Sequence, residues 1–402
     1  MRLHPAVSSR LALGALATLV ATAASIVSPA SAAAQGTLST QGFGYPGGQQ
    51  STRSLGAGGA LGESDPFSAT NPAAIYNFGG SVLYFQAEPE YRTVTVGGES
   101  ERATIARYPL VTAGVPIGSS FFSGLTVSNL LDRSFSSTSR SSQVIRGTSV
   151  ASTNGFSSNG AIGDVRLALA WAPTSWLHLG GAGHVITGDN KLRSSQVFDD
   201  SSKYAALVDT QTVTYTGTAY SAGVDLVAGG IATFSGSYRR GGPLSIKRAD
   251  TTLRTGHVPD RLSLGAAFIG LRGSTVGVRA SRETWSNLAS LATQGLQVND
   301  AWDTSVGADV LGPRLFGSPV QVRAGARRRT LPFGVPSRFL DPTFQGGGEP
   351  VKESSYSFGT GLALGRGRAA LDLAAIHASR TAANVALTET AWTFSLGVSV
   401  RP

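Results

Sequence analysis

WTFSLGVSV, at residues 392–400 near the C-terminus, has an apolar side chain at every second position. The apolar set is Trp392, Phe394, Leu396, Val398 and Val400. A period of two places these side chains on one face of a β-strand and the intervening Thr, Ser and Gly residues on the other, whereas a helix with about 3.6 residues per turn would mix the two sets. The segment therefore predicts a strand with one apolar and one weakly polar face.

The same alternation continues through most of the chain from residue 80 onward. It is clearest in residues 164–171, 262–268, 320–327 and 356–364. A soluble β-sandwich also alternates. Here, however, the less apolar face carries Gly, Ala and Ser with isolated charges rather than the frequent Lys and Glu of a sheet that faces water, and aromatic residues stand near segment ends. This pattern favours an all-β fold, a transmembrane antiparallel β-barrel.

The composition supports a sheet and limits the classes of function. Gly accounts for 51 of 402 residues and charged residues for only 14%. The formal net charge is +9, but the arginines are scattered among the strands without a basic, aromatic-rich patch, so we expect no nucleic-acid partner. The chain contains no Cys, which excludes disulfides, cysteine-linked lipid anchors and thiolate metal sites.

The N-terminus has the pattern of a secretory signal peptide. Arg2 and Arg10 are followed by an apolar run that ends at residue 27, and small residues at 30–34 offer cleavage sites. The run is shorter than the roughly 20 residues that a spanning helix needs, so we expect a signal peptide at residues 1–34 rather than a membrane anchor. These features predict export through the periplasm. An exported chain without a spanning helix is soluble, lipid-anchored or a closed β-barrel, and the alternation described above favours a barrel in the cell outer membrane.

Residues 35–79 differ from the rest of the chain, because they are rich in Gly, Ser and Ala and do not alternate. About 45 residues are too few for a stable core of their own, so we expect this segment to pack inside the barrel formed by residues 80–402. Long polar connections are expected at residues 133–160, 188–204, 287–300 and 329–353, and short turns at residues 173–175 and 365–367. Short turns on one side and long loops on the other are typical of outer-membrane barrels.

Four short stretches share their order and spacing with a known family. They are residues 55–62 followed by Asn71-Pro72-Ala73, residues 168–181, PDRLSLG at residues 259–265, and RETWSNL at residues 282–288. These stretches resemble the FadL-like outer-membrane transporters of long-chain fatty acids and other hydrophobic compounds. The resemblance implies a barrel of about fourteen strands whose N-terminal segment folds into the lumen as a hatch. It also implies that an apolar ligand is captured from outside, binds beside the hatch and leaves through an opening in the barrel wall toward the lipid.

The resemblance assigns the hatch motif to Asn71, Pro72 and Ala73, and ligand contacts to the apolar neighbours Phe67, Ile75 and Phe78. A proline fixes its φ angle and an adjacent Asn can satisfy backbone groups, so the motif should form a rigid corner inside the lumen. The related PorV-like barrels share this motif but serve protein secretion, so a secretion or surface-attachment role with a secreted-protein partner is the alternative.

The other expected partners are a hydrophobic small-molecule ligand, outer-membrane lipid, lipopolysaccharide and the barrel-assembly machinery. The chain departs from the family pattern at its end, which reads Val400-Arg401-Pro402 rather than the aromatic residue that the assembly machinery reads. The nearest aromatic residues, Trp392 and Phe394, lie further in.

Charged residues on the inner face have two interpretations. Arg279, Arg323 and Arg327 could attract the carboxylate of a fatty acid, because a guanidinium meets a carboxylate with two parallel hydrogen bonds. Alternatively, Asp303, Asp309 and Asp372 could neutralise such arginines and fix the hatch. We include Arg279 and Arg323 among the expected ligand-binding residues.

The residues give little support to catalysis. The chain has no Gly-x-Ser-x-Gly elbow, and none of its five histidines forms the zinc-binding helical motif. His178 and His184 share the parity of lumen-facing residues and could contact a ligand or make structural hydrogen bonds. Asp199, Asp200 and Glu349 could hold calcium in external loops, but adjacent acids there are usually only solvated. We therefore expect no enzyme, cofactor or metal and predict passive uptake through a closed lumen, whereas a general channel for hydrophilic solutes would have an open one.

Overall fold

The computed structural model describes residues 42–96, 99–145, 147–270, 273–292, 296–315, 318–334, 350–382 and 387–402. The predicted signal peptide at residues 1–34, residues 35–41 of the following segment, and Glu349 lie outside the described residues. Within these described ranges, no helix is long and apolar enough to cross a membrane.

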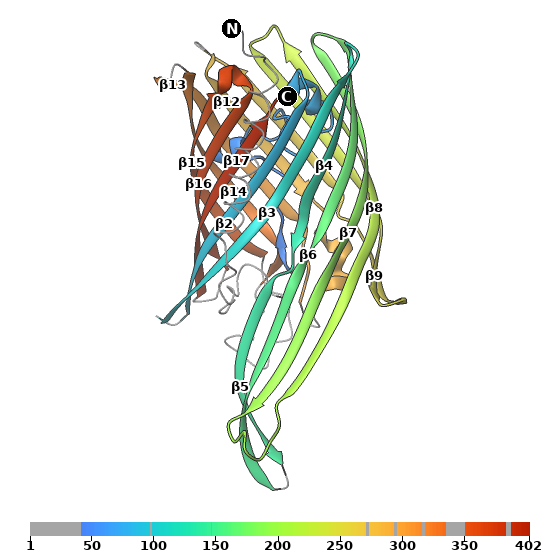
Figure 1. Ribbon diagram of the computed structural model, residues 1–402, viewed down its shortest axis with the longest axis vertical. Helices are drawn as coiled ribbons and strands as arrows, with labels where there is room; N and C mark the ends of the chain where they lie inside the picture. Colours follow the sequence, from blue (N-terminus) through green and yellow to red (C-terminus); the bar gives the residue numbers. More distant parts are fainter. Residues whose placement is uncertain are drawn as a thin grey trace, which may run out of the picture.

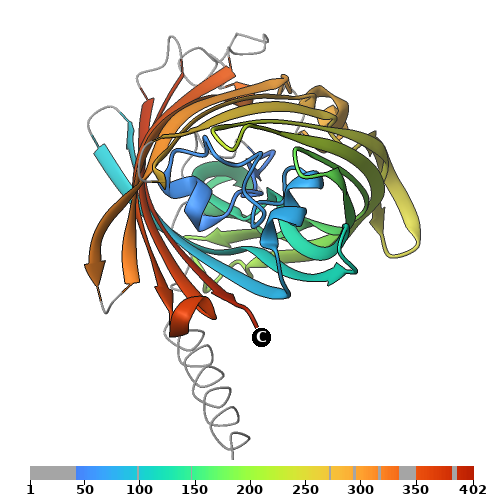
Figure 2. The same cartoon turned by 90° about the horizontal axis from the view of Figure 1, so that it is seen from above.

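Fourteen of the described strands form a closed antiparallel barrel, which confirms the predicted fold class (Figure 1, Figure 2). The strands are β2 (Val82–Val96), β3 (Glu99–Ile117), β4 (Phe121–Asp132), β6 (Thr148–Thr174), β7 (Leu177–Phe198), β8 (Leu207–Ala228), β9 (Ala232–Arg248), β11 (Arg261–Ile269), β12 (Thr275–Glu283), β13 (Ala301–Leu315), β14 (Ser318–Gly334), β15 (Pro350–Leu364), β16 (Ala369–Thr381) and β17 (Leu387–Val400). The ring closes where β17 pairs with β2. Two further strands, β5 (Phe135–Ile145) and β10 (Thr251–His257), pair with β6 and β9 and continue the lines of β4 and β11.

The barrel wall separates the two sets of residues that alternate in the sequence. On β17, Trp392 and Phe394 are 48% and 46% exposed on the outer face, whereas Ser395 is buried inside. On β6, Leu167 is exposed outside and Arg166 is buried inside. The outer face is therefore a band of large apolar side chains, as contact with lipid requires.

The two ends of the barrel differ in their connections. At one end, here termed the turn end, neighbouring strands are joined by short turns such as residues 118–120 and residues 175–176 and by the single-turn helix η5 (Gly365–Gly367). The C-terminus lies at this end (Figure 1). The opposite end is termed the loop end.

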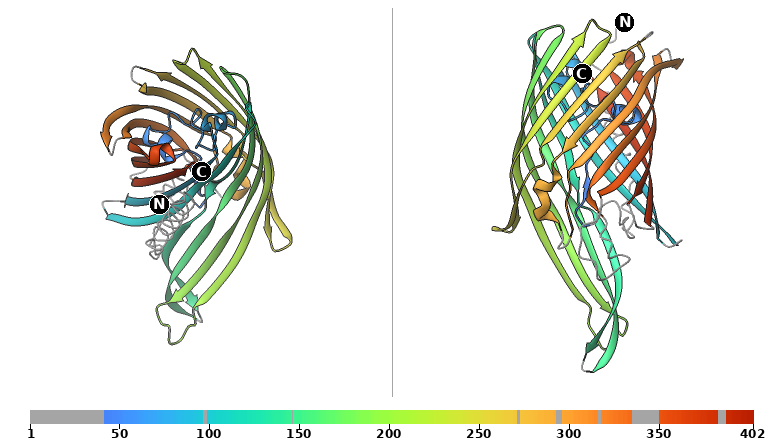
Figure 3. Two further views of the ribbon diagram at one scale, coloured as in Figure 1. Left: turned by 45° about the horizontal axis from the view of Figure 1, so that its top comes forward. Right: turned by 180° about the vertical axis from the view of Figure 1, so that it is seen from behind.

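The predicted polar loops at residues 133–160 and 188–204 are largely strands, so this prediction was wrong. β5 pairs with β6 along its whole length, and β6 pairs with β7 as far as Phe198. These strands project beyond the ring at the loop end (Figure 1, Figure 3). Ser, Thr and Asn occupy both faces of this projection, so the sequence has no alternation to detect although the backbone pairing continues.

Residues 42–80, termed the N-terminal segment, lie inside the barrel (Figure 2). The segment contains β1 (Tyr45–Pro46), α3 (Thr52–Gly56) and the short helix η1 (Ala73–Phe78). Ser51 caps α3, because its hydroxyl accepts a hydrogen bond from the Ser54 amide at 3.1 Å. α3 packs on β14 to β17, while η1 packs on β3, β4 and β6 to β8. The segment thus occupies the lumen toward the turn end.

Candidate functional site

The motif at residues 71–73 rests directly on the barrel wall at two facing glycines. Gly180 of β7 pairs with Gly223 of β8. A Cβ atom at Gly180 would lie 2.3 Å from the Ala73 nitrogen, and one at Gly223 would lie 1.9 Å from Asn71 Oδ1. Both distances are far shorter than van der Waals contact, so a larger residue at either position would push the motif off the wall. Nothing in the sequence pattern marks this flat docking patch.

Asn71 satisfies several buried polar groups at once. Its side-chain amide donates to Asp225 Oδ1 at 2.7 Å and to the Glu63 carbonyl at 3.0 Å, and its Oδ1 accepts from the Ala73 amide at 2.9 Å. Pro72, with φ −67°, stands at the start of η1. The structure brings the three motif residues together at one corner, and their action as a hatch stays a prediction.

A second glycine patch receives the turn that follows α3. Gly277, Gly307 and Gly325 lie side by side on β12, β13 and β14. A Cβ atom at Gly307 would lie 2.0 Å from the Ala57 carbonyl oxygen, and one at Gly325 would lie 2.4 Å from the Gly58 nitrogen. The N-terminal segment is therefore seated on two separate parts of the wall.

Phe67, Ile75 and Phe78, which were expected to contact a ligand, lie in a packed apolar group termed the turn-end cluster. The ring centroids of Phe67 and Phe78 are 5.0 Å apart, and Phe78 lies 5.5 Å from Phe122 of β4. Phe67 also lies 4.8 Å from Tyr84 of β2. In this arrangement the three residues dock the N-terminal segment on the wall, and a ligand contact stays a prediction.

Arg279 joins the N-terminal segment to the wall. Its Nε lies 3.1 Å from Glu63 Oε1, and its Nη1 lies 2.9 Å from Asp303 Oδ2 on β13. Burial alone would raise the pKa of the Glu63 carboxyl, but the guanidiniums of Arg261 and Arg279 outweigh burial and hold this pKa below its ordinary value of 4.5. Glu63 is therefore ionised at neutral pH, and it shares Arg279 with Asp303.

Arg323 is neutralised in the same way. Its Nε lies 2.9 Å from Asp309 Oδ2, and its Nη1 lies 2.6 Å from Asp372 Oδ1. This arrangement agrees with the second interpretation of the inner-face arginines, in which acidic residues neutralise them. Ligand binding by Arg279 or Arg323 stays a prediction, and it would require a ligand to displace a bound carboxylate.

Tyr45 of β1 stands at the centre of a charged cluster that the sequence analysis missed. Its hydroxyl donates to Glu353 Oε2 at 2.8 Å and accepts from Arg380 Nη2 at 2.9 Å. Four guanidiniums lie between 4.7 and 5.3 Å from the centroid of its ring, those of Arg92, Arg107, Arg329 and Arg380. Cations over an aromatic face attract its π-electrons, so these contacts hold β1 against the wall.

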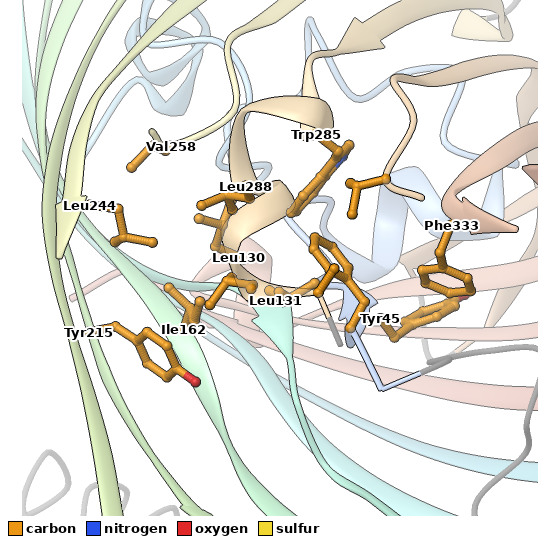
Figure 4. Close-up of a cluster of buried hydrophobic side chains, with 14 of the residues drawn as sticks. Tyr45, Leu130, Leu131, Ile162, Tyr215, Leu244, Val258, Trp285, Leu288 and Phe333 are labelled. Atoms are coloured by element: carbon orange, nitrogen blue, oxygen red, sulfur yellow. The ribbon is translucent and has the colours of Figure 1, made fainter. Parts of the chain in front are cut away.

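A second apolar group, termed the loop-end cluster, lies inside the barrel toward the loop end (Figure 4). Its side chains come mainly from the wall and from the short helix η3 (Trp285–Leu291), and Phe43 of the N-terminal segment meets Trp285 at 6.1 Å. The members labelled in Figure 4 are Tyr45, Leu130, Leu131, Ile162, Tyr215, Leu244, Val258, Trp285, Leu288 and Phe333. The interior of a water-filled channel is polar, whereas a site for a hydrophobic molecule is lined by apolar side chains. The loop-end cluster has the second kind of lining.

The loop-end cluster cannot be recognised in the sequence, for a physical reason. On β6, the inner-face positions change from Asp164 to Ile162 within one step of the alternation. The apolar members are therefore scattered singly over many strands, and only the register between strands brings them into contact.

A polar layer separates the loop-end cluster from the lumen near the turn end. His184 Nδ1 lies 2.8 Å from Asp164 Oδ1, and His184 Nε2 lies 2.8 Å from Ser221 Oγ. Gln49 of the N-terminal segment lies 3.2 Å from Asp164 Oδ2 and 3.2 Å from Arg239 Nη1. All five residues are buried and hydrogen-bonded to one another, so a hydrophobic molecule would have to break this layer to pass along the lumen.

The barrel wall is interrupted between β3 and β4. Their pairing stops where Leu110 faces Ser128. β4 continues to Asp132, and there it pairs with β1 of the N-terminal segment instead of β3. The Gly47 amide donates to the Leu130 carbonyl at 2.9 Å, so the segment also satisfies a backbone group of β4. The N-terminal segment therefore takes the place of a neighbouring strand along this part of β4.

A pocket of about 520 Å³ lies on the outer face of the barrel, over β8, β9, β11 and β12. It is centred on Gly236, which pairs with Val224 and Leu264 and leaves a depression between their side chains. Phe234 and Leu264 are exposed on the outer face. This pocket opens away from the lumen, so we do not count it as part of the ligand passage.

Comparison with known proteins shows a likeness in structure rather than in sequence. No family model matches the chain, and no curated protein matches its sequence. The crystal structure of a Pseudomonas aeruginosa FadL homologue aligns with a TM-score of 0.61 at 14% identity, covering 90% of this chain and 99% of that one. The chain has a FadL-like fold.

Two hydrocarbon transporters share this FadL-like fold. The CymD monoaromatic hydrocarbon channel aligns with a TM-score of 0.52 at 13% identity, covering 89% of this chain and 98% of that one. The P. putida toluene transporter TodX aligns with a TM-score of 0.53 at 13% identity, covering 85% and 98%. The FadL-like barrel of fourteen strands that the sequence resemblance implies is thus confirmed, and the hatch stays a prediction.

The two lumen histidines of the FadL-like barrel have structural contacts. His184 makes the hydrogen bonds of the polar layer, and the His178 ring packs 4.7 Å from that of Tyr76. In the part of the chain that the structure describes, no group of three or more His, Asp or Glu residues is placed to hold a metal ion.

Proposed function

We propose that this FadL-like barrel carries hydrophobic small molecules, such as long-chain fatty acids, passively across the outer membrane. The observation that carries the proposal is the loop-end cluster, an apolar surface inside a barrel whose neighbouring inner layer is polar. Apolar molecules leave water readily for such a surface. The outer band of apolar side chains supports insertion in the outer membrane. The similar structures of a monoaromatic hydrocarbon channel and a toluene transporter support a hydrophobic cargo.

The inferred route starts at the loop end and leaves through the wall. The polar layer and the N-terminal segment obstruct the way along the lumen. Leu130 and Leu131 belong to the loop-end cluster and also lie on the part of β4 that β3 does not cover. Displacement of β1 would therefore open a path from the cluster to the membrane lipid. Movement of Asn71, Pro72 and Ala73 on their glycine patch would be the hatch step.

We infer that the chain is not an enzyme and uses no cofactor. The similar structures reported above are transport proteins, which supports this inference indirectly. The alternative role in secretion or surface attachment is not favoured, because the comparisons give a FadL homologue and hydrocarbon channels instead. Lipopolysaccharide, the barrel-assembly machinery and a secreted protein stay predicted partners.

The experiment that tests the proposal is recovery of ligand from the detergent-purified protein. Organic-solvent extraction and mass spectrometry should yield a hydrophobic compound in near-stoichiometric amount from the wild type. Ala219→Trp, which places a large ring in the loop-end cluster, should reduce this yield. Ala222→Trp, on the exposed outer face of the same strand, is the matched control.

Two results would overturn the proposal. An empty wild-type barrel that conducts ions steadily in planar bilayers would indicate a channel for hydrophilic solutes. An empty barrel that purifies with a secreted protein would favour the secretion role.

A further inference from the structure

Arg133, between β4 and β5, is a buried arginine without an acidic partner among the described residues. It is 7% exposed, and its Nε and Nη1 have no hydrogen-bond partner in that part of the chain. Its Nη2 makes one long contact, 3.4 Å, to the Gly42 carbonyl oxygen, and its guanidinium lies 5.8 Å from the centroid of the Tyr215 ring. The adjacent acid, Asp132, is already engaged, because its Oδ2 lies 2.7 Å from Arg107 Nε.

Three other arginines inside the barrel are neutralised by close carboxylates. Arg107, Arg279 and Arg323 each have a carboxylate oxygen within 3.1 Å. A buried ion without a partner is strongly unfavourable, so a guanidinium left in this state is expected to have a use that needs its free N–H groups. Arg166 also has unpaired N–H groups, but it lies among the charges of Asp164 and Glu63. Burial lowers the pKa of the Arg133 guanidinium from its ordinary value, and the nearby Tyr215 partly opposes this shift.

Arg133 is located at the border of the loop-end cluster. It directly follows β4, whose last residues include the cluster members Leu130 and Leu131, and Leu131 pairs with Ile162 of β6. Tyr215 belongs to the same cluster, and its hydroxyl points away from Leu244 and Val258 (Figure 4). One side of this site is thus apolar and the other side carries a free cation and a phenol.

Two further polar residues, Ser158 and Asn190, lie beside Arg133 on the loop-end side of the cluster. Ser158 Oγ donates to the Arg133 carbonyl at 2.5 Å, and Asn190 Nδ2 donates to Ser158 Oγ at 3.0 Å. On their strands, both residues stand nearer the loop end than the cluster members Ile162 and Ile186. A ligand that matches this order of surfaces has a polar head toward the loop end and an apolar tail toward the polar layer.

We propose that Arg133 binds the carboxylate of an amphipathic acid whose hydrocarbon tail packs on the loop-end cluster. This inference rests on the proposed function and narrows it, because it selects hydrophobic acids over neutral hydrocarbons as the preferred cargo. A guanidinium and a carboxylate form paired, charge-assisted hydrogen bonds, which a neutral hydrocarbon or ester cannot replace. The ligand lies with its head at Arg133 and its tail near Trp285 and Leu288.

The first experiment compares two probes, hexadecanoic acid and its methyl ester, on the full-length protein purified in detergent. The wild type should bind the acid more tightly than the ester. Arg133→Met should weaken binding of the acid by about 10- to 100-fold, as expected for loss of a hydrogen bond to a charged group, and leave binding of the ester unchanged. Arg133→Lys should keep most of the preference for the acid. Arg193→Met, at an exposed position of β7, is the control for the loss of one positive charge.

The outcomes separate this inference from the proposed function. If the wild type and Arg133→Met bind the acid equally well, the role of Arg133 is overturned while the proposed function stands. If the wild type binds neither probe, the proposed function fails, and the inference fails with it.

The second experiment measures the orientation of the ligand in the wild-type protein. Hexadecanoic acid that carries bromine at its tail end should quench the fluorescence of buried Trp285 more than acid brominated beside the carboxylate. Trp285→Phe gives the background from Trp171, Trp176, Trp302 and Trp392, which are exposed. The opposite order of quenching would overturn the proposed orientation.

Discussion

The turn-end and loop-end halves of the lumen both bury apolar side chains, but these side chains come from different sources. At the turn end, Phe67, Ile75 and Phe78 of the N-terminal segment fill the space against β2, β3 and β4. At the loop end, the apolar surface belongs mainly to the barrel wall and η3, and the segment contributes only Phe43 and Tyr45. The N-terminal segment thus completes the core at the turn end, whereas at the loop end the wall and η3 supply the apolar side chains that the proposed cargo would contact.

Phe78→Ala tests the turn-end half and has the largest expected effect. Removal of this buried ring should lower the free energy of unfolding by about 3–5 kcal/mol, because the packed cluster loses contacts and gains a cavity. Urea titration followed by fluorescence measures this change. Binding of hexadecanoic acid should be unaffected. A variant that keeps its stability but loses ligand would instead support Phe78 as a ligand contact. That result would contradict the difference between the two halves of the lumen.

Glu63→Gln tests how the N-terminal segment is held. Loss of the ion pair with Arg279 should destabilise the docked segment by about 2–3 kcal/mol. In the wild type, the pKa of Glu63 lies below its ordinary value of 4.5, so its stabilisation is complete above that value and is lost as the pH falls through the lowered pKa. Protease cleavage within residues 42–80 should therefore increase in acid for the wild type. If cleavage of the Glu63→Gln variant increases in acid as much as that of the wild type, ionisation of Glu63 is not the cause of the increase.

Gly223→Val tests the docking of the Asn-Pro-Ala corner. The new Cβ would lie 1.9 Å from Asn71 Oδ1, so the motif must leave the wall, at an expected cost of about 1–3 kcal/mol in docking. Ion conductance in planar bilayers should rise, since the displaced segment no longer fills the turn-end lumen. Gly183→Val is the control, because no atom lies within 4 Å of its Cβ position. Equal conductance of the two variants would show that the corner does not close the lumen.

Ser221→Ala tests the polar layer between the halves and has the smallest expected effect. The hydroxyl makes one hydrogen bond, to His184 Nε2, and its loss should cost about 1 kcal/mol. Retention of hexadecanoic acid should not change.

The Asp164, His184 and Ser221 side chains also have the order of a hydrolytic triad, so the wild type should be treated with a fluorophosphonate. Labelling of Ser221 would contradict the inference that the chain is not an enzyme.

The sequence predicted the elements that rest on local periodicity. Alternation in residues 164–171 and 392–400 predicted which side chains face outward, because successive strand residues point to opposite faces whatever their partners are. Alternation did not predict the strands at residues 133–160. Polar side chains occupy both faces there, so the paired strands have no apolar and polar alternation in their sequence. The site was harder to predict from the sequence. Asn71 and Pro72 were identified by resemblance. Gly180 and Gly223 beneath them were not, since many glycines in this chain are ordinary strand residues.

By itself, the sequence determined a β-barrel with an apolar outer face and a non-alternating N-terminal segment, because both depend on the order of residues along one strand or segment. Only the tertiary structure decided that Arg279 and Arg323 are neutralised while Arg133 is not, and that residues from distant strands form the loop-end cluster. The physical reason is that charge pairing and apolar contact act between neighbours in space. In a closed barrel, the register of each strand with the next determines those neighbours.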